Sequence, residues 1–257
     1  MNGFGPLDRF ASFDGVEIAY TLFGDGPDVL LLHGFASDHI GNWVRPGIAA
    51  ALVESGRRVI AYDARGHGAS GKPHEVDAYE HDAMVRDAQA LLDRLAVTAV
   101  DVVGYSMGAI VSSRLVPHEP RARSLVLGGV GGRLAHGRSP EVRARTAAAL
   151  EARAASPQAR PVDRAFRRFA QRSGNDLAAL AAVQRAAAAG TPGDLGAIRV
   201  PTLVVAGVDD RLAGAPGELA ALIHGAETAA IAGNHLSAVA EPLAAAIVGF
   251  LGRVSPT

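Results

Sequence analysis

Residues 102–108 read V-V-G-Y-S-M-G and place Ser106 between Gly104 and Gly108. The apolar residues before this segment favour a strand, and those after it favour a helix. A sharp turn from strand to helix strains the backbone of its central residue, and it needs small neighbours because the strand and helix approach closely. The pattern therefore predicts that Ser106 stands clear of the sheet as a nucleophile. The alternative is a serine buried in a glycine-rich turn.

A histidine and two aspartates follow later in the chain, in positions that suit a serine nucleophile. The serine hydroxyl needs a base to take its proton, and the base needs a carboxylate to hold its tautomer and orientation. Asp209 and Asp210 come directly after one apolar segment, and His235 comes after the next. Ligands of open α/β sheets bind at the carboxyl ends of the strands. We therefore expect Ser106, His235 and one of the two aspartates to meet at that edge.

Short apolar segments alternate with helical ones along most of the chain, which is typical of a mostly parallel sheet covered on both faces. The expected strands are residues 29–32, 58–62, 100–103, 124–127, 202–206 and 228–231. The expected helices are residues 42–55, 80–95, 106–116, 216–222 and 236–251. Before them, the sequence alternates apolar and polar residues around Asp14-Gly15, which predicts an antiparallel hairpin.

The segment 131–196 breaks this alternation, because it contains no strand-like run. Ser139-Pro140 offers a helix start, and residues 162–171 and 177–189 have helical patterns. The glycines of residues 128–132 could form a hinge or a tightly packed loop.

Four further motifs accompany the Gly-x-Ser-x-Gly turn. They are L-L-L-H-G-F at residues 30–35, A-Y-D-A-R-G-H-G-A-S at 61–70, G-x-x-D at 207–210 and G-N-H-L-S-A-V-A-E-P at 233–242. With these motifs the chain resembles the α/β-hydrolase family, from about Phe10 to the last helix. The resemblance implies a single domain over residues 1–257 with the α/β-hydrolase fold, a mostly parallel twisted sheet with helices on both faces. It also implies that residues 131–196 form a helical cap inserted after strand six.

The resemblance implies a role for each site residue. The family's acid stands three residues after the strand-end glycine, which selects Asp210, with Asp209 as the alternative. Ser106 would be the nucleophile and His235 the base. The oxyanion hole would be formed by the backbone N–H groups of Phe35 and Met107.

Other polar residues of these motifs are expected to be structural. Asp63 would pair with the nearby Arg65 and pin its loop, and His33 and His67 would form structural hydrogen bonds in the family loops. The remaining histidines are expected in solvated or capping positions: His39, His74, His81, His118, His136 and His224.

Several apolar residues could line a substrate pocket or belong to the core. Phe35 and Met107 are two of them. The expected pocket residues are Gly34, Trp43, Tyr105, Phe166 and Phe169. Because the segment 131–196 is rich in alanine and poor in aromatic residues, we expect short acyl esters or compact lactones rather than lipids.

Composition excludes several classes of function. The chain has no cysteine, so neither a disulfide nor a thiol nucleophile is available, and we expect no metal and no cofactor. The net charge of −1 gives no reason to expect nucleic acid or a membrane as a partner, and the oligomeric state stays open. No long apolar run and no basic leader is present, which predicts a cytoplasmic protein with a small-molecule substrate.

The charge is unevenly distributed. Between residues 133 and 190, eleven arginines stand against four acidic residues, a local excess of seven positive charges. These arginines could form solvated helix faces, or they could attract an anionic substrate to the site.

The leading hypothesis is a serine hydrolase that cleaves a carboxylic ester or lactone through an acyl-enzyme. The same residues also serve carbon–carbon bond hydrolases and cofactor-free haloperoxidases or perhydrolases, which remain alternatives. A small-molecule receptor or regulatory protein on the same fold is the alternative of another class. Epoxide hydrolases and haloalkane dehalogenases need aspartate at the position of Ser106, which argues against them.

Overall fold

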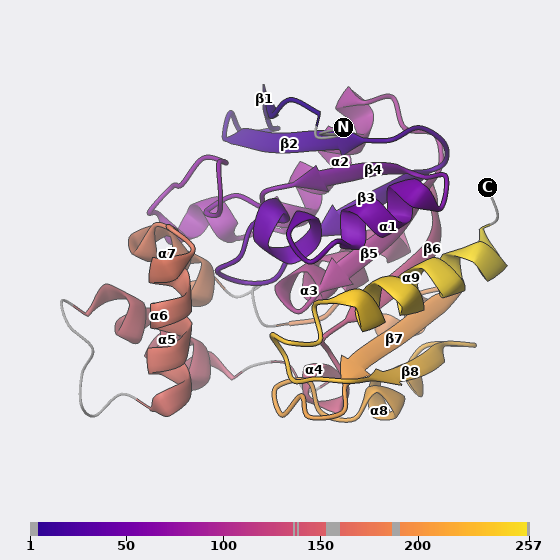
Figure 1. Ribbon diagram of the computed structural model, residues 1–257. Coiled ribbons are helices and arrows are strands. Elements are labelled where there is room, and N and C mark those ends of the chain that lie inside the picture. Colours follow the sequence, from indigo (N-terminus) through magenta and orange to yellow (C-terminus); the bar gives the residue numbers. More distant parts are fainter. Residues whose placement is uncertain (1–4, 136, 138, 153–159, 187–190, 256–257) are drawn as a thin grey trace.

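The protein is an eight-stranded sheet flanked by helices in the computed structural model, which describes residues 5–135, 137, 139–152, 160–186 and 191–255 (Figure 1). The strand order is β1-β2-β4-β3-β5-β6-β7-β8. The strands are β1 (Asp8–Ala11), β2 (Glu17–Phe23), β3 (Asp28–Leu32), β4 (Arg58–Tyr62), β5 (Val100–Tyr105), β6 (Ala122–Gly128), β7 (Thr202–Gly207) and β8 (Glu227–Ile231).

The six strands β4-β3-β5-β6-β7-β8 each pair in parallel with their neighbours in this series. At the other end of the sheet, β2 pairs antiparallel with both β4 and β1. The turn between β1 and β2 contains Gly15 with a φ of 86°, so the hairpin predicted at Asp14-Gly15 is confirmed. The predicted α/β-hydrolase architecture is confirmed as well. Parallel pairing matters for function because it brings the carboxyl ends of β5, β7 and β8 to one edge.

Helices cover both faces of the sheet. They are α1 (Ile48–Glu54), α2 (Ala83–Arg94), α3 (Met107–Leu115), α8 (Pro216–Ala220) and α9 (Glu241–Val254). Figure 1 shows α1 and α9 in front of the sheet and α2 and α3 behind it. Successive strand residues point to opposite faces, so Leu31 packs with α1 and α9 whereas Leu30 and Leu32 pack with α2 and α3. Two apolar cores result, one on each side of the sheet.

In the described residues between β6 and β7 there are four α-helices and a short 3-10 helix (Leu195–Ala197). The α-helices are α4 (Gly132–Ala135), α5 (Pro140–Glu151), α6 (Pro161–Arg172) and α7 (Leu177–Arg185). At the start of α5, the Ser139 side chain accepts a hydrogen bond from the Val142 N–H, as expected of an N-cap. The described residues of this helical insertion contain no strand, and α5 to α7 lie to one side of the sheet in Figure 1.

Two expected helices begin or divide differently in the structure. The helix expected at residues 42–55 is a π-helical turn (Ile40–Val44) followed by α1, because Pro46 cannot donate a backbone hydrogen bond and Gly47 has a φ of 84°. The helix expected from Leu236 begins only at Glu241. None of the helices in the described parts of the chain is long and apolar enough to cross a bilayer.

Candidate active site

Ser106 occupies the sharp turn between β5 and α3. Its backbone has φ 53° and ψ −109°, a conformation that L-residues rarely adopt. A Cβ atom at Gly108 would collide with the backbone carbonyl of Leu32, and one at Gly104 would collide with the carbonyl of Gly108. Only glycine therefore fits at these two positions, for the reason that the sequence pattern suggested.

The structure brings Ser106, His235 and Asp210 together from the carboxyl ends of β5, β8 and β7. The Nε2 atom of His235 lies 3.0 Å from the Ser106 hydroxyl, and its Nδ1 atom lies 2.8 Å from Asp210 Oδ2. An ionised carboxylate can only accept, so Nδ1–H donates to Asp210 and Nε2 is free to accept the serine proton. The exposed Asp209 is not in contact with the imidazole.

Asp210 is well held for its position. Its Oδ1 atom accepts backbone hydrogen bonds from Leu212 at 2.9 Å and Ala213 at 3.0 Å. Burial would raise the pKa of Asp210, but the hydrogen bond from His235 and these backbone donors lower the pKa below the ordinary value of 3.8. The carboxylate is thus ionised and fixed at neutral pH.

The loop after β3 lies beside Ser106. A Cβ atom at Gly34 would lie 3.5 Å from Ser106 Cβ, and the Gly34 N–H donates to Asn42 Oδ1 at 2.9 Å. In the described part of the chain, the next N–H group, that of Phe35, has no hydrogen-bond acceptor, and neither has the N–H of Met107. Both groups are thus available to a ligand. Sequence reasoning missed Asn42, for which the motif carries no signal.

His33 and His67 have the structural roles expected of them. His33 lies 2.9 Å from the Gly34 carbonyl through Nδ1 and accepts from the Ala64 N–H at 3.0 Å through Nε2. Burial lowers the pKa of His33, and burial together with His33 lowers the pKa of His67 to about 3. Both imidazoles are therefore neutral and fix the loop that carries Phe35.

The expected pairing of Asp63 with Arg65 is wrong. Asp63 Oδ1 accepts from both the backbone N–H and the Nδ1 of His39, each at 2.8 Å. Arg65 binds Asp87 and Asp14 instead, through contacts of 2.6 to 3.2 Å. Two residues apart in the chain, Asp63 and Arg65 project in different directions, so each takes a partner from another segment.

His39 is consequently buried and hydrogen-bonded to Asp63 and not solvated, which corrects the expectation for this histidine. Four other histidines are exposed as expected: His74, His81, His118 and His224. His136 lies outside the described residues.

An apolar cavity of about 240 Å³ adjoins Ser106 and His235. Its lining includes four of the five expected pocket residues together with Phe35: Gly34, Tyr105, Phe166 and Phe169. Trp43 is not among them, which is a correction. It belongs to the π-helical turn and is fully buried in the core between the sheet, α1 and α9.

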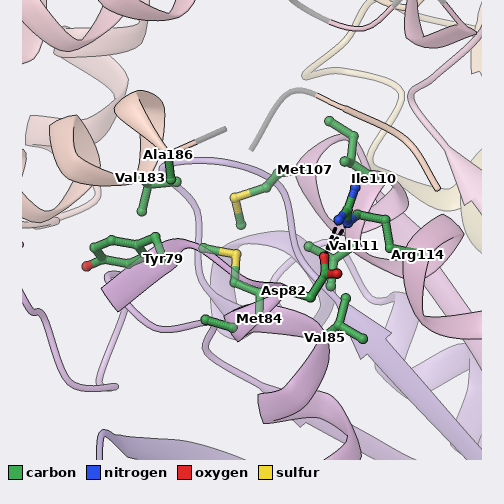
Figure 2. Close-up of a pocket in the computed structure, with 11 residues that line it drawn as sticks. Tyr79, Asp82, Met84, Val85, Met107, Ile110, Val111, Arg114, Val183 and Ala186 are labelled. Atoms are coloured by element: carbon green, nitrogen blue, oxygen red, sulfur yellow. Dashed lines mark hydrogen bonds and ion pairs between the residues drawn. The ribbon is translucent and has the colours of Figure 1, made fainter. Parts of the chain in front are cut away.

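The side chain of Met107 also lies elsewhere. Because Met107 begins α3, its thioether leaves the helix toward α2 and enters a separate small cavity with Met84 and Val183. Figure 2 shows both methionines in this cavity, beside the ion pair between Asp82 and Arg114. Only the backbone N–H of Met107 is therefore on the side of Ser106.

Comparison with known proteins agrees with this architecture. The family model for the alpha/beta hydrolase fold matches residues 27–136. The AB hydrolase superfamily protein YfhM of Bacillus subtilis is 33% identical over 120 residues, which are 45% of this chain and 40% of that protein. The chain thus spans about two fifths of that relative's length.

Solved structures match over nearly the whole chain. A hydrolase from Pseudomonas aeruginosa PA01 is 31% identical with a TM-score of 0.77, covering 96% of this chain and 99% of that one. The enol-lactonase from Burkholderia xenovorans LB400 is 25% identical with a TM-score of 0.78, covering 95% and 99%. Sheet order, the turn at Ser106 and these likenesses lead to one conclusion: the chain belongs to the α/β-hydrolase family.

Proposed function

We propose that the protein is a serine hydrolase that cleaves a carboxylic ester or a lactone of a small substrate through an acyl-enzyme. One observation carries the proposal: Ser106, His235 and Asp210 form a continuous hydrogen-bonded chain, 3.0 and 2.8 Å per link, that ends in an apolar cavity. The solved relative at 31% identity is itself a hydrolase.

In the first half of the reaction, His235 takes the proton of Ser106 as its hydroxyl oxygen attacks the carbonyl carbon of the substrate. The imidazolium is stabilised by the ionised Asp210 and then gives its proton to the leaving alcohol. The bond between the carbonyl carbon and the alcohol oxygen breaks, and the acyl group remains on Ser106.

In the second half, water takes the place of the alcohol. His235 accepts a proton from the water, the hydroxide oxygen attacks the acyl carbon, and Ser106 leaves as its hydroxyl after regaining that proton. Both halves place negative charge on the former carbonyl oxygen. The N–H groups of Phe35 and Met107 would bind this oxyanion, because both lie beside Ser106 without a protein acceptor in the described structure.

The cavity sets the size of the substrate. About 240 Å³ is below the range of about 300 to 1,000 Å³ usual for drug-sized ligands, so a compact acyl group fits better than a long chain. Phe166 and Phe169 come from α6, so the helical insertion would act as the cap over the site.

A labelling experiment tests this function. A fluorophosphonate should modify the wild type at Ser106 and should not modify Ser106→Ala, whose turnover of short para-nitrophenyl esters should fall by several orders of magnitude. The circular dichroism spectrum should be unchanged. If Ser106→Ala kept more than about a tenth of wild-type turnover, the nucleophile assignment would be wrong.

The same measurements separate an enzyme from a receptor. A receptor would bind ligand equally well with serine or alanine at this position, and its wild type would hardly turn over any ester or lactone.

A further inference from the structure

Ser106 and His235 stand between two cavities. One is the apolar cavity described above, and the other has a volume of about 490 Å³ and extends beneath α4 and the start of α6. We call the second one the arginine cavity, because Arg133 and Arg160 line it. Besides Ser106 and His235, the two linings share the apolar residues Val162, Phe166 and Leu212.

The two cavities differ in charge. The apolar cavity has no Arg, Lys, Asp or Glu in its lining, whereas the arginine cavity has two arginines and Asp163. Asp163 is nearly buried, and its carboxylate lies 3.3 Å from the Thr146 hydroxyl. Two guanidinium groups and one carboxylate leave a net positive charge of one next to the reacting serine.

Within the described structure, neither Arg133 nor Arg160 forms an ion pair or a side-chain hydrogen bond. The stem of Arg133 runs close over Gly214, where a Cβ atom would lie 3.1 Å from Arg133 Cγ. Gly214 has a φ of 78° and so tolerates no ordinary side chain there. The loop after β7 thus leaves room for this arginine beside the cavity.

Other arginines of the insertion have structural partners. Arg143 donates to the Ala186 carbonyl, and Arg167 donates to two carbonyls at the end of α5. Arg185 forms an ion pair with Glu151. Three arginines of this segment thus hold helices together, and two line the arginine cavity, whereas others such as Arg145 and Arg168 are exposed outside both cavities.

We propose that Arg133 and Arg160 bind a carboxylate group of the substrate, so that the preferred substrate is an ester or lactone that also carries a free carboxylate. A planar guanidinium matches a carboxylate with two parallel hydrogen bonds, which an ammonium group does not provide. The cavity's net charge of one suits a singly charged anion. The inference rests on the hydrolase function proposed above, since the two cavities would hold the two halves of one ester.

The first test uses two esters of equal length and different charge. The para-nitrophenyl monoester of glutarate ends in a carboxylate, and para-nitrophenyl valerate ends in a methyl group. In the double variant Arg133→Gln/Arg160→Gln, kcat/KM for the glutarate ester should fall about tenfold or more, while that for valerate should change less than about twofold. An equal fall for both esters would mean that the bound carboxylate is not on the acyl half, and it would overturn the proposal if the second pair of esters, described below, showed no preference either.

The matched control is Arg145→Gln/Arg168→Gln, which removes the same charge from exposed positions of α5 and α6 outside both cavities. Its glutarate-to-valerate ratio should equal that of the wild type. If the control lowered the ratio as much as the cavity variant, the effect would be long-range attraction and the proposed site would be wrong.

A second pair of esters places the carboxylate on the leaving group: para-acetoxybenzoate against para-acetoxytoluene. A loss of anion preference on either pair supports the proposal and identifies the half of the ester that enters the arginine cavity. A preference on neither pair, or a preference for a cationic ester drawn to Asp163, overturns it.

A measurement of glutarate binding without turnover tests the carboxylate site independently of the proposed hydrolase function. Ser106→Ala protein should bind glutarate in a calorimetric titration, and adding the two arginine substitutions should raise Kd about tenfold or more. If the wild type hydrolysed no ester, the proposed function would fail while this titration still decided the carboxylate site. Absent or unchanged binding would overturn the site.

Discussion

The phenolic hydroxyl of Tyr105 donates a 2.7 Å hydrogen bond to the backbone carbonyl of His235. The residue before Ser106 is thus tied to the loop that carries the imidazole, across the distance from β5 to β8. The centroids of the Tyr105 and His235 rings are 5.5 Å apart. Tyr105 lines the apolar cavity, as expected, and this link adds a positioning role that the sequence did not reveal.

Removing only this hydroxyl should affect stability and turnover together. Tyr105→Phe should lower the free energy of unfolding by about 1 kcal/mol, because one partly buried hydrogen bond is lost. It should also lower kcat several-fold, since the His235 loop loses an anchor. Urea denaturation and ester kinetics measure the two effects.

Tyr79→Phe is the matched control, because the Tyr79 hydroxyl donates a similar 2.6 Å bond to the Pro73 carbonyl, away from the His235 loop. It should cost similar stability and leave kcat unchanged. A kcat loss in both variants would argue against a specific role for Tyr105.

The backbone strain at Ser106 should appear as a stability difference between two inactive variants. Ser106→Gly should be more stable than Ser106→Ala by about 1 kcal/mol, because glycine relieves a strain of about 1 to 3 kcal/mol and loses part of this through the greater entropy of its unfolded chain. Thermal or urea unfolding of the two proteins provides the measurement. Equal stabilities would mean that the strain at φ 53° is no larger than the entropy that glycine costs in the unfolded chain.

Asparagine substitutions at Asp209 and Asp210 should identify which carboxylate orients His235. Asp210→Asn should lower kcat about a thousandfold or more, because an amide can donate to Nδ1 and so favour the wrong histidine tautomer. Asp209→Asn should have little effect, since Asp209 is exposed and does not contact His235. The reverse ranking would transfer the role to Asp209.

Asn42 should hold the loop after β3 that carries the Phe35 N–H group. Asn42→Ala removes the acceptor of the Gly34 N–H, so the adjacent Phe35 N–H loses its fixed direction. We expect kcat to fall about tenfold with a smaller change in KM, because the loss concerns the charge that develops in the transition state. A change confined to KM would instead assign Asn42 to substrate binding.

Asp63 should make stability depend on acid pH. Burial would raise the pKa of Asp63, but the hydrogen bond from His39, electrostatic interactions with His33 and His39 and the Ala69 N–H lower the pKa from 3.8 to about 2. A carboxylate with a lowered folded-state pKa stabilises the protein above its unfolded value, and this contribution is lost as the pH falls from 3.8 to about 2.

The corresponding measurement compares wild type with Asp63→Asn. Over that pH range the free energy of unfolding of the wild type should fall by about 2 kcal/mol more than that of the variant. Parallel pH profiles would show that the Asp63–His39 pair does not stabilise the folded state.

Local patterns predicted most strands and that Ser106 and His235 meet with one of two aspartates, and the resemblance to the family selected Asp210. Each of those residues follows a short apolar strand, and parallel pairing brings strand ends to one edge. Ser139 as a helix start and the Asp14-Gly15 hairpin were likewise predictable, because both depend on residues adjacent in sequence.

Side-chain direction and partner choice were less accessible to sequence. Trp43 and Met107 are apolar residues near the site, but the rotation of their helical turns directs both side chains away from Ser106. Asp63 forms its hydrogen bonds with His39 and not with Arg65, because segments distant in the sequence meet in the fold. Arg133 lies on α4 and Arg160 directly precedes α6, so only the tertiary structure reveals that they share a cavity.

The helical insertion leaves and re-enters the sheet at neighbouring strands. Leu125 of β6 pairs in parallel with Thr202, the first residue of β7, so the insertion leaves the sheet at its carboxyl edge and returns at the amino end of the neighbouring strand, and the ladder fixes the span between the two ends. The entropy of closing such a loop grows only slowly, by about 0.6 kcal/mol for each doubling of its length. Evolution can therefore lengthen, shorten or replace these helices at little cost to folding, while Ser106, Asp210 and His235 keep their places on the strands outside them.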